Sequence, residues 1–103
     1  MTNDQQRAMN GEPLRQLVKI NNPLGLHMRP ITEFSKLAYQ FQSRVIVSKA
    51  GHPEPADGKS PISLLSLGVL PGTELTLEVS GPDQDQALDA LIKLLAHLDR
   101  EEA

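Results

Sequence analysis

Gly25-Leu26-His27-Met28-Arg29-Pro30 is the segment that decides the fold, because it contains the start of the first helix. Pro30 fixes φ and lacks the N–H that a first helical turn does not use, so the helix is expected to start at about Arg29 or Pro30. His27 would then lie where backbone amides and the positive end of the helix dipole attract anions such as phosphate. Arg29 adds a guanidinium that suits phosphate oxygens. The segment therefore suggests a histidine that carries a phosphoryl group.

The residues on either side of this segment predict a strand and a helix. Over residues 14–21, Val18 and Ile20 share one face of a strand, which Asn21-Asn22-Pro23 ends. Residues 30–42 have one apolar stripe with the 3.6-residue period of an amphipathic helix. The stripe consists of Ile31, Phe34, Leu37, Ala38 and Phe41. We therefore expect a strand, a loop that carries His27, and a helix, in that order.

Two more strands are predicted after this helix. Residues 43–49 are rich in β-branched side chains, which favour a strand, and residues 50–53 are expected to turn. Residues 54–57 can form a short strand. Because Pro53 and Pro55 cannot donate to a ladder, this strand is expected at a sheet edge.

A second helix start is Ser60-Pro61. Ser60 can cap the helix as an acceptor, and Pro61 suits the first helical position. The helix is expected to end at about Leu67, with Gly68 at its C-terminal end. Its apolar residues are Ile62, Leu64, Leu65 and Leu67. These exceed one core-facing stripe, so one or two are expected at the surface, where an apolar patch near His27 would suit partner docking.

The last quarter of the chain predicts a strand and a long helix. Residues 73–80 alternate between apolar and polar side chains, the pattern of a half-buried strand. Asp83 is the expected cap of a helix that runs to about Arg100, and Asp85 in its first turn favours the dipole. Its apolar stripe consists of Leu88, Leu91, Ile92, Leu95 and Leu98.

The element order is therefore βαββαβα, which predicts an α+β fold. We expect an open-faced two-layer sandwich, in which three helices cover one face of a four-stranded antiparallel sheet. The other face of the sheet is expected to meet water.

Composition limits what this chain can do. The 103 residues suit one domain, with a flexible polar tail over residues 1–13 and a folded unit over residues 14–103. A net charge of −3 with no basic stripe argues against nucleic acid as a partner. The lack of cysteine excludes disulfides and thiol chemistry. No signal peptide or membrane-length apolar run is present, so we expect a cytoplasmic protein without a membrane partner.

The sequence gives less reason to assign a chemical role to the remaining candidate residues than to His27. His52 lies in a proline-rich turn and His97 on the last helix, where surface positions are the ordinary interpretation. Ser60 is explained as a helix cap, although a phosphoryl group at such a position is a known form of switch. Nucleotide loops, metal-ligand spacings and nucleophile motifs are missing from the sequence, so neither a cofactor nor a metal is expected.

Two motifs with this element order make residues 14–100 resemble the HPr family, the histidine phosphocarriers of the bacterial phosphotransferase system. One motif is Gly-Leu-His-x-Arg-Pro, here residues 25–30. The other is a Lys-Ser helix start with an apolar segment that ends in Ser-Leu-Gly, here residues 59–68. Gly72-Thr73-Glu74 and Gly81-x-Asp83 also correspond.

The resemblance implies a monomeric, stoichiometric carrier rather than a turnover enzyme. His27 would be phosphorylated on Nδ1 by Enzyme I, with phosphoenolpyruvate as the source, and would pass the group to an enzyme IIA component. Arg29 would balance charge during the transfer. Ser60 matches the serine that HPr kinase/phosphorylase modifies in carbon-catabolite control.

Met28, Pro61 and the stiff segment over residues 50–57 depart from the family pattern, and Pro61 bears on recognition of Ser60 by the kinase. Two alternatives stay open. One is the nitrogen-related, NPr-like branch of the same family, and the other is a non-covalent module that binds a small metabolite.

Overall fold

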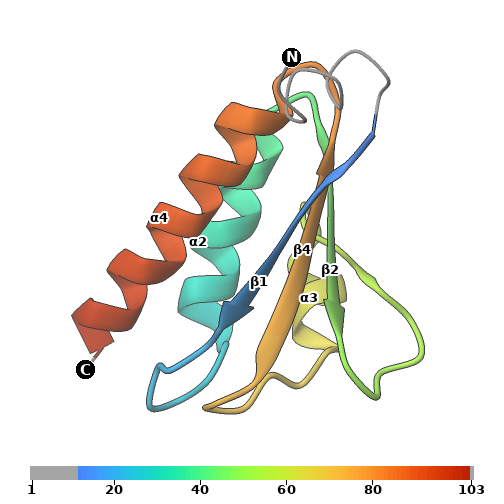
Figure 1. The fold of residues 1–103 in the computed structure, drawn as a ribbon. Coiled ribbons are helices and arrows are strands. Elements are labelled where there is room, and N and C mark those ends of the chain that lie inside the picture. The colour runs from blue at the N-terminus through green and yellow to red at the C-terminus, as the bar shows by residue number, and fades with distance from the viewer. Residues whose placement is uncertain (1–11, 103) are drawn as a thin grey trace.

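The computed structural model describes residues 12–102 of the chain. Most of the predicted tail, residues 1–11, lies outside the described residues. The elements are β1 (Leu14–Lys19), α2 (Met28–Tyr39), β2 (Arg44–Lys49), β3 (Ala56–Asp57), α3 (Pro61–Leu65), β4 (Glu74–Ser80) and α4 (Gln84–Glu102). Their order is the predicted βαββαβα (Figure 1).

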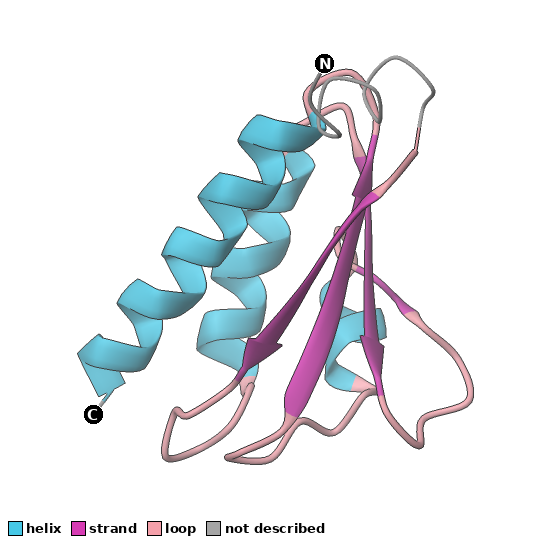
Figure 2. Ribbon diagram, in the orientation of Figure 1, coloured by secondary structure: helices cyan, strands magenta, loops and turns pink. Residues whose placement is uncertain are grey.

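The strands form one four-stranded antiparallel sheet in the order β1-β4-β2-β3 (Figure 2). β4 is central because it pairs with both β1 and β2. The two-residue strand β3 takes the edge beside β2, as its neighbouring prolines predict. The predicted sheet is therefore confirmed.

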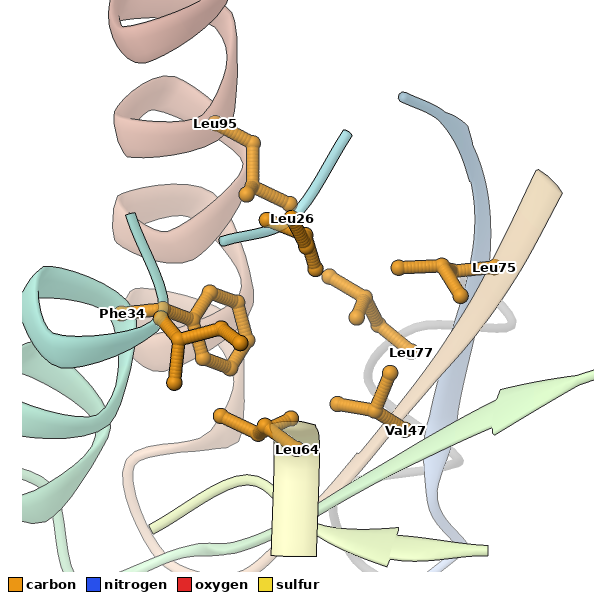
Figure 3. A pocket seen from close by; sticks show the side chains of 8 residues that line it. Leu26, Phe34, Val47, Leu64, Leu75, Leu77 and Leu95 are labelled. Carbon is orange, nitrogen blue, oxygen red and sulfur yellow. The ribbon is translucent and has the colours of Figure 1, made fainter. Parts of the chain in front are cut away.

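All three helices pack against the same face of the sheet. One core cluster contains side chains from each helix, among them Phe34 of α2, Leu64 of α3 and Leu95 of α4, together with Leu77 of β4. Figure 3 shows these four side chains converging on a small apolar cavity. The opposite face is exposed and carries charged residues beside the exposed Leu17: Nε of Arg15 donates to Oε1 of Glu78 at 3.0 Å, across β1 and β4. This is the open-faced, two-layer arrangement expected from the sequence.

Helix α2 differs from the prediction at both ends. It begins at Met28, so Pro30 is its third residue rather than its first or second. Proline is tolerated there because the first-turn amides have no intrahelical acceptor. Its last residue is Tyr39, not residue 42, because the carboxylate of Asp83 accepts hydrogen bonds from the amides of Gln42 and Ser43, at 2.9 Å each.

Asp83 holds the predicted cap position of α4 but uses its side chain differently. Its carbonyl accepts the amide of Ala87 at 2.9 Å, as the residue before a helix does. Its carboxylate instead bonds to the segment after α2. The buried Gln84 links the turn to the start of the sheet, since its Nε2 donates to the carbonyl of Glu12 at 3.1 Å.

Helix α3 is shorter than expected and ends at Leu65. Gly68 still terminates the segment, with φ of +61° and its amide bonded to the carbonyl of Leu65. Within residues 12–102, no helix is both long enough and apolar enough to cross a membrane.

Candidate functional site

His27 is the N-cap residue of α2. Its backbone is extended (φ −104°, ψ −172°), and its carbonyl accepts the amide of Ile31 at 3.0 Å, which is the first bond of the helical ladder. Its ring makes no capping hydrogen bond to the first turn. The side chain is half-buried, and the side chains of Met28 and Arg29, which follow it, are exposed. The structure therefore places His27 and Arg29 together at the N-terminal end of α2.

This end of α2 is suited to an anion. The ladder starts at the amide of Ile31, and Pro30 has no N–H, so the amides of Met28 and Arg29 precede the intrahelical bonds. The dipole of a 12-residue helix adds partial positive charge at the same place. Backbone donors at a helix N-terminus and an arginine side chain both favour an anion, so this end of α2 has the chemistry of an anion site.

A tight turn fixes the loop that carries His27. The amide of Gly25 donates to the carbonyl of Asn22 at 2.9 Å, and Pro23 and Leu24 lie between them. Gly25 has φ of +67°, which favours glycine, and a Cβ at this position would lie 2.1 Å from the carbonyl oxygen of Val69. The amide of Leu26 donates to that same oxygen at 3.0 Å. The close approach of two loops therefore requires Gly25.

Sequence reasoning missed Val69 and Asn22 as supports of the loop. Val69 contributes a backbone oxygen, which no sequence pattern identifies. Asn22 is 3% exposed, and its Nδ2 donates to the carbonyl of Leu98 at 3.4 Å. Asn-Pro marks a turn in the sequence, but nothing local indicates that the asparagine would contact α4.

Ser60 lies in a separate turn that leads into α3. Its Oγ accepts the amide of Ser63 at 3.2 Å, and Pro61 is the first helical residue, so the predicted cap is confirmed. The neighbouring Lys59 extends its ammonium to the carbonyl of Phe41, 2.8 Å away, just beyond the end of α2. His27 and Arg29 thus share one end of α2, and Ser60 is not part of that arrangement.

Five exposed apolar side chains, from the start of α2, from α3 and from two loops, make up what we call the apolar rim. Its members are Leu24, Met28, Ile62, Leu65 and Leu70. The hydrogen bond between Leu26 and Val69 brings their loops together at the His27 end of the sheet. Ile62 is 82% exposed, whereas Leu64 of the same helix is 1% exposed. The predicted surface exposure of one or two α3 residues is therefore confirmed.

The chain is similar in sequence to known phosphocarrier proteins. The family model described as "PTS HPr component phosphorylation site" matches residues 14–97. Phosphocarrier protein HPr of Cupriavidus necator is 38% identical over 84 residues, which cover 82% of this chain and 92% of that protein. Phosphocarrier protein NPr of Escherichia coli is 35% identical over 81 residues, covering 79% and 89%.

A solved structure of a histidine-containing phosphocarrier protein from Mycoplasma has the same fold. It superimposes with a TM-score of 0.79 at 26% identity, over 84% of this chain and 96% of that one. Since the family match covers most of the described residues and includes the His27 loop, this chain belongs to the HPr family of phosphocarriers of the phosphotransferase system.

Proposed function

We propose that His27 accepts a phosphoryl group from phospho-Enzyme I and passes it to an enzyme IIA component. The observation that carries this proposal is the position of His27 as the N-cap of α2, with a ring that is not used to cap the helix. Arg29 and the first-turn amides belong to the same end of α2. No other histidine of the described residues precedes a helix: His52 lies in a turn, and His97 lies within α4.

The transfer requires few groups of this chain: the His27 ring, the Arg29 guanidinium and the N-terminal end of α2. The lone pair of Nδ1 in the neutral ring attacks phosphorus, and the bond from phosphorus to the donor nitrogen of Enzyme I breaks as the new bond forms. A neutral ring nitrogen needs no separate base. The Arg29 guanidinium and the helix dipole balance the incoming charge. The same step in reverse delivers the group to the acceptor, so the chain acts as a stoichiometric carrier and not as a turnover enzyme.

The apolar rim is the surface that would meet both partners. Leu24 and Met28 flank His27 in sequence, the Leu26 to Val69 hydrogen bond brings the loop of Leu70 beside the His27 loop, and Ile62 and Leu70 are 82% and 70% exposed. An exposed apolar surface that is contiguous marks a protein interaction site. Enzyme I and enzyme IIA would therefore dock here in turn, on a monomer in the cytoplasm.

Ser60 is the proposed site of regulation by HPr kinase/phosphorylase. Its half-buried hydroxyl caps α3, and Ile62 of the rim is only two residues away. Phosphorylation there would add close to two negative charges beside the docking surface and slow the transfer through His27. Pro61 has a fixed φ and no backbone N–H, which limits how a kinase could bind the segment around Ser60.

The direct test is intact-mass spectrometry at alkaline pH after incubation with phosphoenolpyruvate, magnesium and Enzyme I. The wild type should gain one acid-labile phosphate, His27→Ala should gain none, and His97→Ala, a change at an exposed histidine, should behave as the wild type. If folded wild type gains no phosphate while an HPr control does, the carrier proposal fails and a non-covalent binding module becomes the better interpretation.

A second candidate is the NPr-like, nitrogen-related branch. The observation that favours it is the presence of NPr proteins among the relatives, at 35% identity against 37–39% for HPr proteins. Incubating the phosphorylated chain with a sugar-type and a nitrogen-type enzyme IIA separates the two. The acceptor that takes the phosphate faster identifies the branch.

A further inference from the structure

Asn22 joins the His27 loop to the last helix of the chain. Its side chain is 3% exposed, and Nδ2 donates to the carbonyl of Leu98, which is 76 residues away in sequence, at 3.4 Å. A buried amide group is stabilised when its donor has a partner, so this contact favours one side-chain orientation. Leu98 is itself 1% exposed and cannot move without disturbing the core.

The same residue also fixes the backbone that leads to His27. The carbonyl of Asn22 accepts the amide of Gly25, which closes the turn, and Leu26 then bonds to Val69. Two residues after Gly25, the chain enters α2 at His27. A shift of Asn22 would therefore move the start of the turn and, through it, the N-cap of α2.

Leu98 lies just beyond the part of the chain that the family model matches, which ends at residue 97. Helix α4 continues past that point to Glu102. The support of the His27 loop thus includes Leu98, in the C-terminal part of α4 that lies outside the matched residues.

We propose that the Leu98 carbonyl, acting through Asn22, positions His27 for phosphoryl transfer. The inference rests on the proposed function of His27 and makes Asn22 a positioning residue that does not itself touch the phosphoryl group. Transfer requires the ring nitrogen in line with the donor, and a misplacement of about 1 Å can cost about a hundredfold in rate. Enzyme I should still dock on the apolar rim when Asn22 is changed, because the rim side chains are unaltered.

The test compares Asn22→Asp with Asn21→Asp in the full chain. The two changes add the same charge to neighbouring residues, but Asn21 is exposed, whereas Asn22 donates to Leu98. A carboxylate at position 22 has no proton to donate and would repel the Leu98 carbonyl. Asn22→Ala, which removes the donor without adding charge, decides the question if Asn22→Asp does not fold.

Two measurements are made on each folded variant. Steady-state phosphorylation by Enzyme I gives kcat and KM with this chain as substrate, and nitrogen-15 NMR gives the ring shifts of His27. We expect the Asn22 variants to lower kcat by at least about tenfold with KM within about twofold, and to change the His27 ring shifts. Asn21→Asp should leave all of these values unchanged.

Unchanged kcat and ring shifts in a folded Asn22 variant would overturn the proposal, and so would equal effects in Asn21→Asp. An unphosphorylated wild type would instead contradict the function proposed for His27. The ring shifts would still report whether Asn22 positions the histidine.

Discussion

The carboxylate of Asp83 accepts hydrogen bonds from both the amide and the hydroxyl of Ser43, at 2.9 Å and 2.5 Å. The amide of Gln42 adds a third, at 2.9 Å. Since Asp83 immediately precedes α4 and Ser43 immediately precedes β2, these bonds join the start of α4 to the segment where α2 gives way to the sheet. They hold the pKa of Asp83 below its ordinary value of 3.8, the Ser43 hydroxyl having the largest effect.

This carboxylate makes stability depend on acid pH. Because the pKa of Asp83 is lower in the folded than in the unfolded chain, the unfolded state binds the proton more readily. The stabilisation is fully present well above pH 3.8 and is lost as the pH falls through the folded pKa. Asp83→Asn should therefore lower the urea midpoint at about pH 6, and its difference from wild type should shrink toward about pH 3.

A double-mutant cycle with Ser43→Ala provides the control for the Asp83 prediction. If the Asp83 to Ser43 bonds carry the effect, the two changes together should cost less than the sum of each alone. Strict additivity, or a difference from wild type that does not vary with pH, would contradict this account.

Gly25→Ala should both destabilise the fold and slow the transfer. The new Cβ would lie 2.1 Å from the Val69 oxygen, at φ of +67°. Gly51→Ala is the matched control, because Gly51 has φ of +85° but a Cβ there meets nothing within 4 Å. We expect a loss of about 1 kcal/mol in unfolding free energy for Gly51→Ala, from backbone strain alone. Gly25→Ala should lose at least about 2 kcal/mol of unfolding free energy. An equal loss in both variants would contradict a steric clash between the new Cβ and the Val69 oxygen.

The sequence predicts the elements of this fold well where the signal is local. The alternation in β4, with Leu75, Leu77 and Val79 inward, depends on neighbours two residues apart and identifies one buried face. The caps at His27 and Ser60 are equally local, because Pro30 and Pro61 lie within three residues of them. The site residues His27 and Arg29 could be chosen for the same reason.

What the sequence could not predict depends on contacts between distant residues. Helix α2 stops early because Asp83, some 40 residues away, takes the amides of Gln42 and Ser43. The loop of His27 depends on a backbone oxygen of Val69 and on the Leu98 carbonyl, and a backbone carbonyl has no residue-specific pattern. Such partners become known only when the topology places them together.

Alanine substitutions at two residues of α3, Leu64 and Ile62, should distinguish an effect on stability from an effect on docking. Leu64 is 1% exposed and lines the central cavity shown in Figure 3, so Leu64→Ala should cost about 2–5 kcal/mol of unfolding free energy. Ile62 is 82% exposed, so Ile62→Ala should change stability by less than about 0.5 kcal/mol. If the apolar rim docks Enzyme I, Ile62→Ala should instead raise KM for phosphorylation. A KM equal to that of the wild type would exclude Ile62 from the docking surface.

Ser60→Ala should weaken α3 by removing its cap. The Ser60 hydroxyl accepts the amide of Ser63, and loss of an N-cap acceptor costs about 1 kcal/mol. Ser60→Asp retains an acceptor and adds a charge, so it should keep stability near wild type but slow phosphorylation of His27. Ser66→Ala, at the C-cap of α3, is the comparison in thermal melts and transfer assays, because it removes a hydroxyl that donates to the Ser63 carbonyl at 2.6 Å but leaves the Ser60 cap intact. Equal transfer rates for Ser60→Asp and wild type would show that a negative charge at position 60 does not regulate the transfer.

Arg29→Lys should slow the transfer without unfolding the protein. Arg29 is exposed in the first turn of α2, so the change removes no core packing. It replaces a planar fork, which can hold two phosphate oxygens, with a point charge. Loss of one charge-assisted hydrogen bond, about 1.5–3 kcal/mol, corresponds to at least about a tenfold lower rate. Arg44→Lys, at an exposed arginine of β2, should phosphorylate at the wild-type rate. If rapid-quench time courses with Enzyme I give the same rate for Arg29→Lys, the guanidinium does not contact the phosphoryl group, and the end of α2 must balance its charge through the backbone alone.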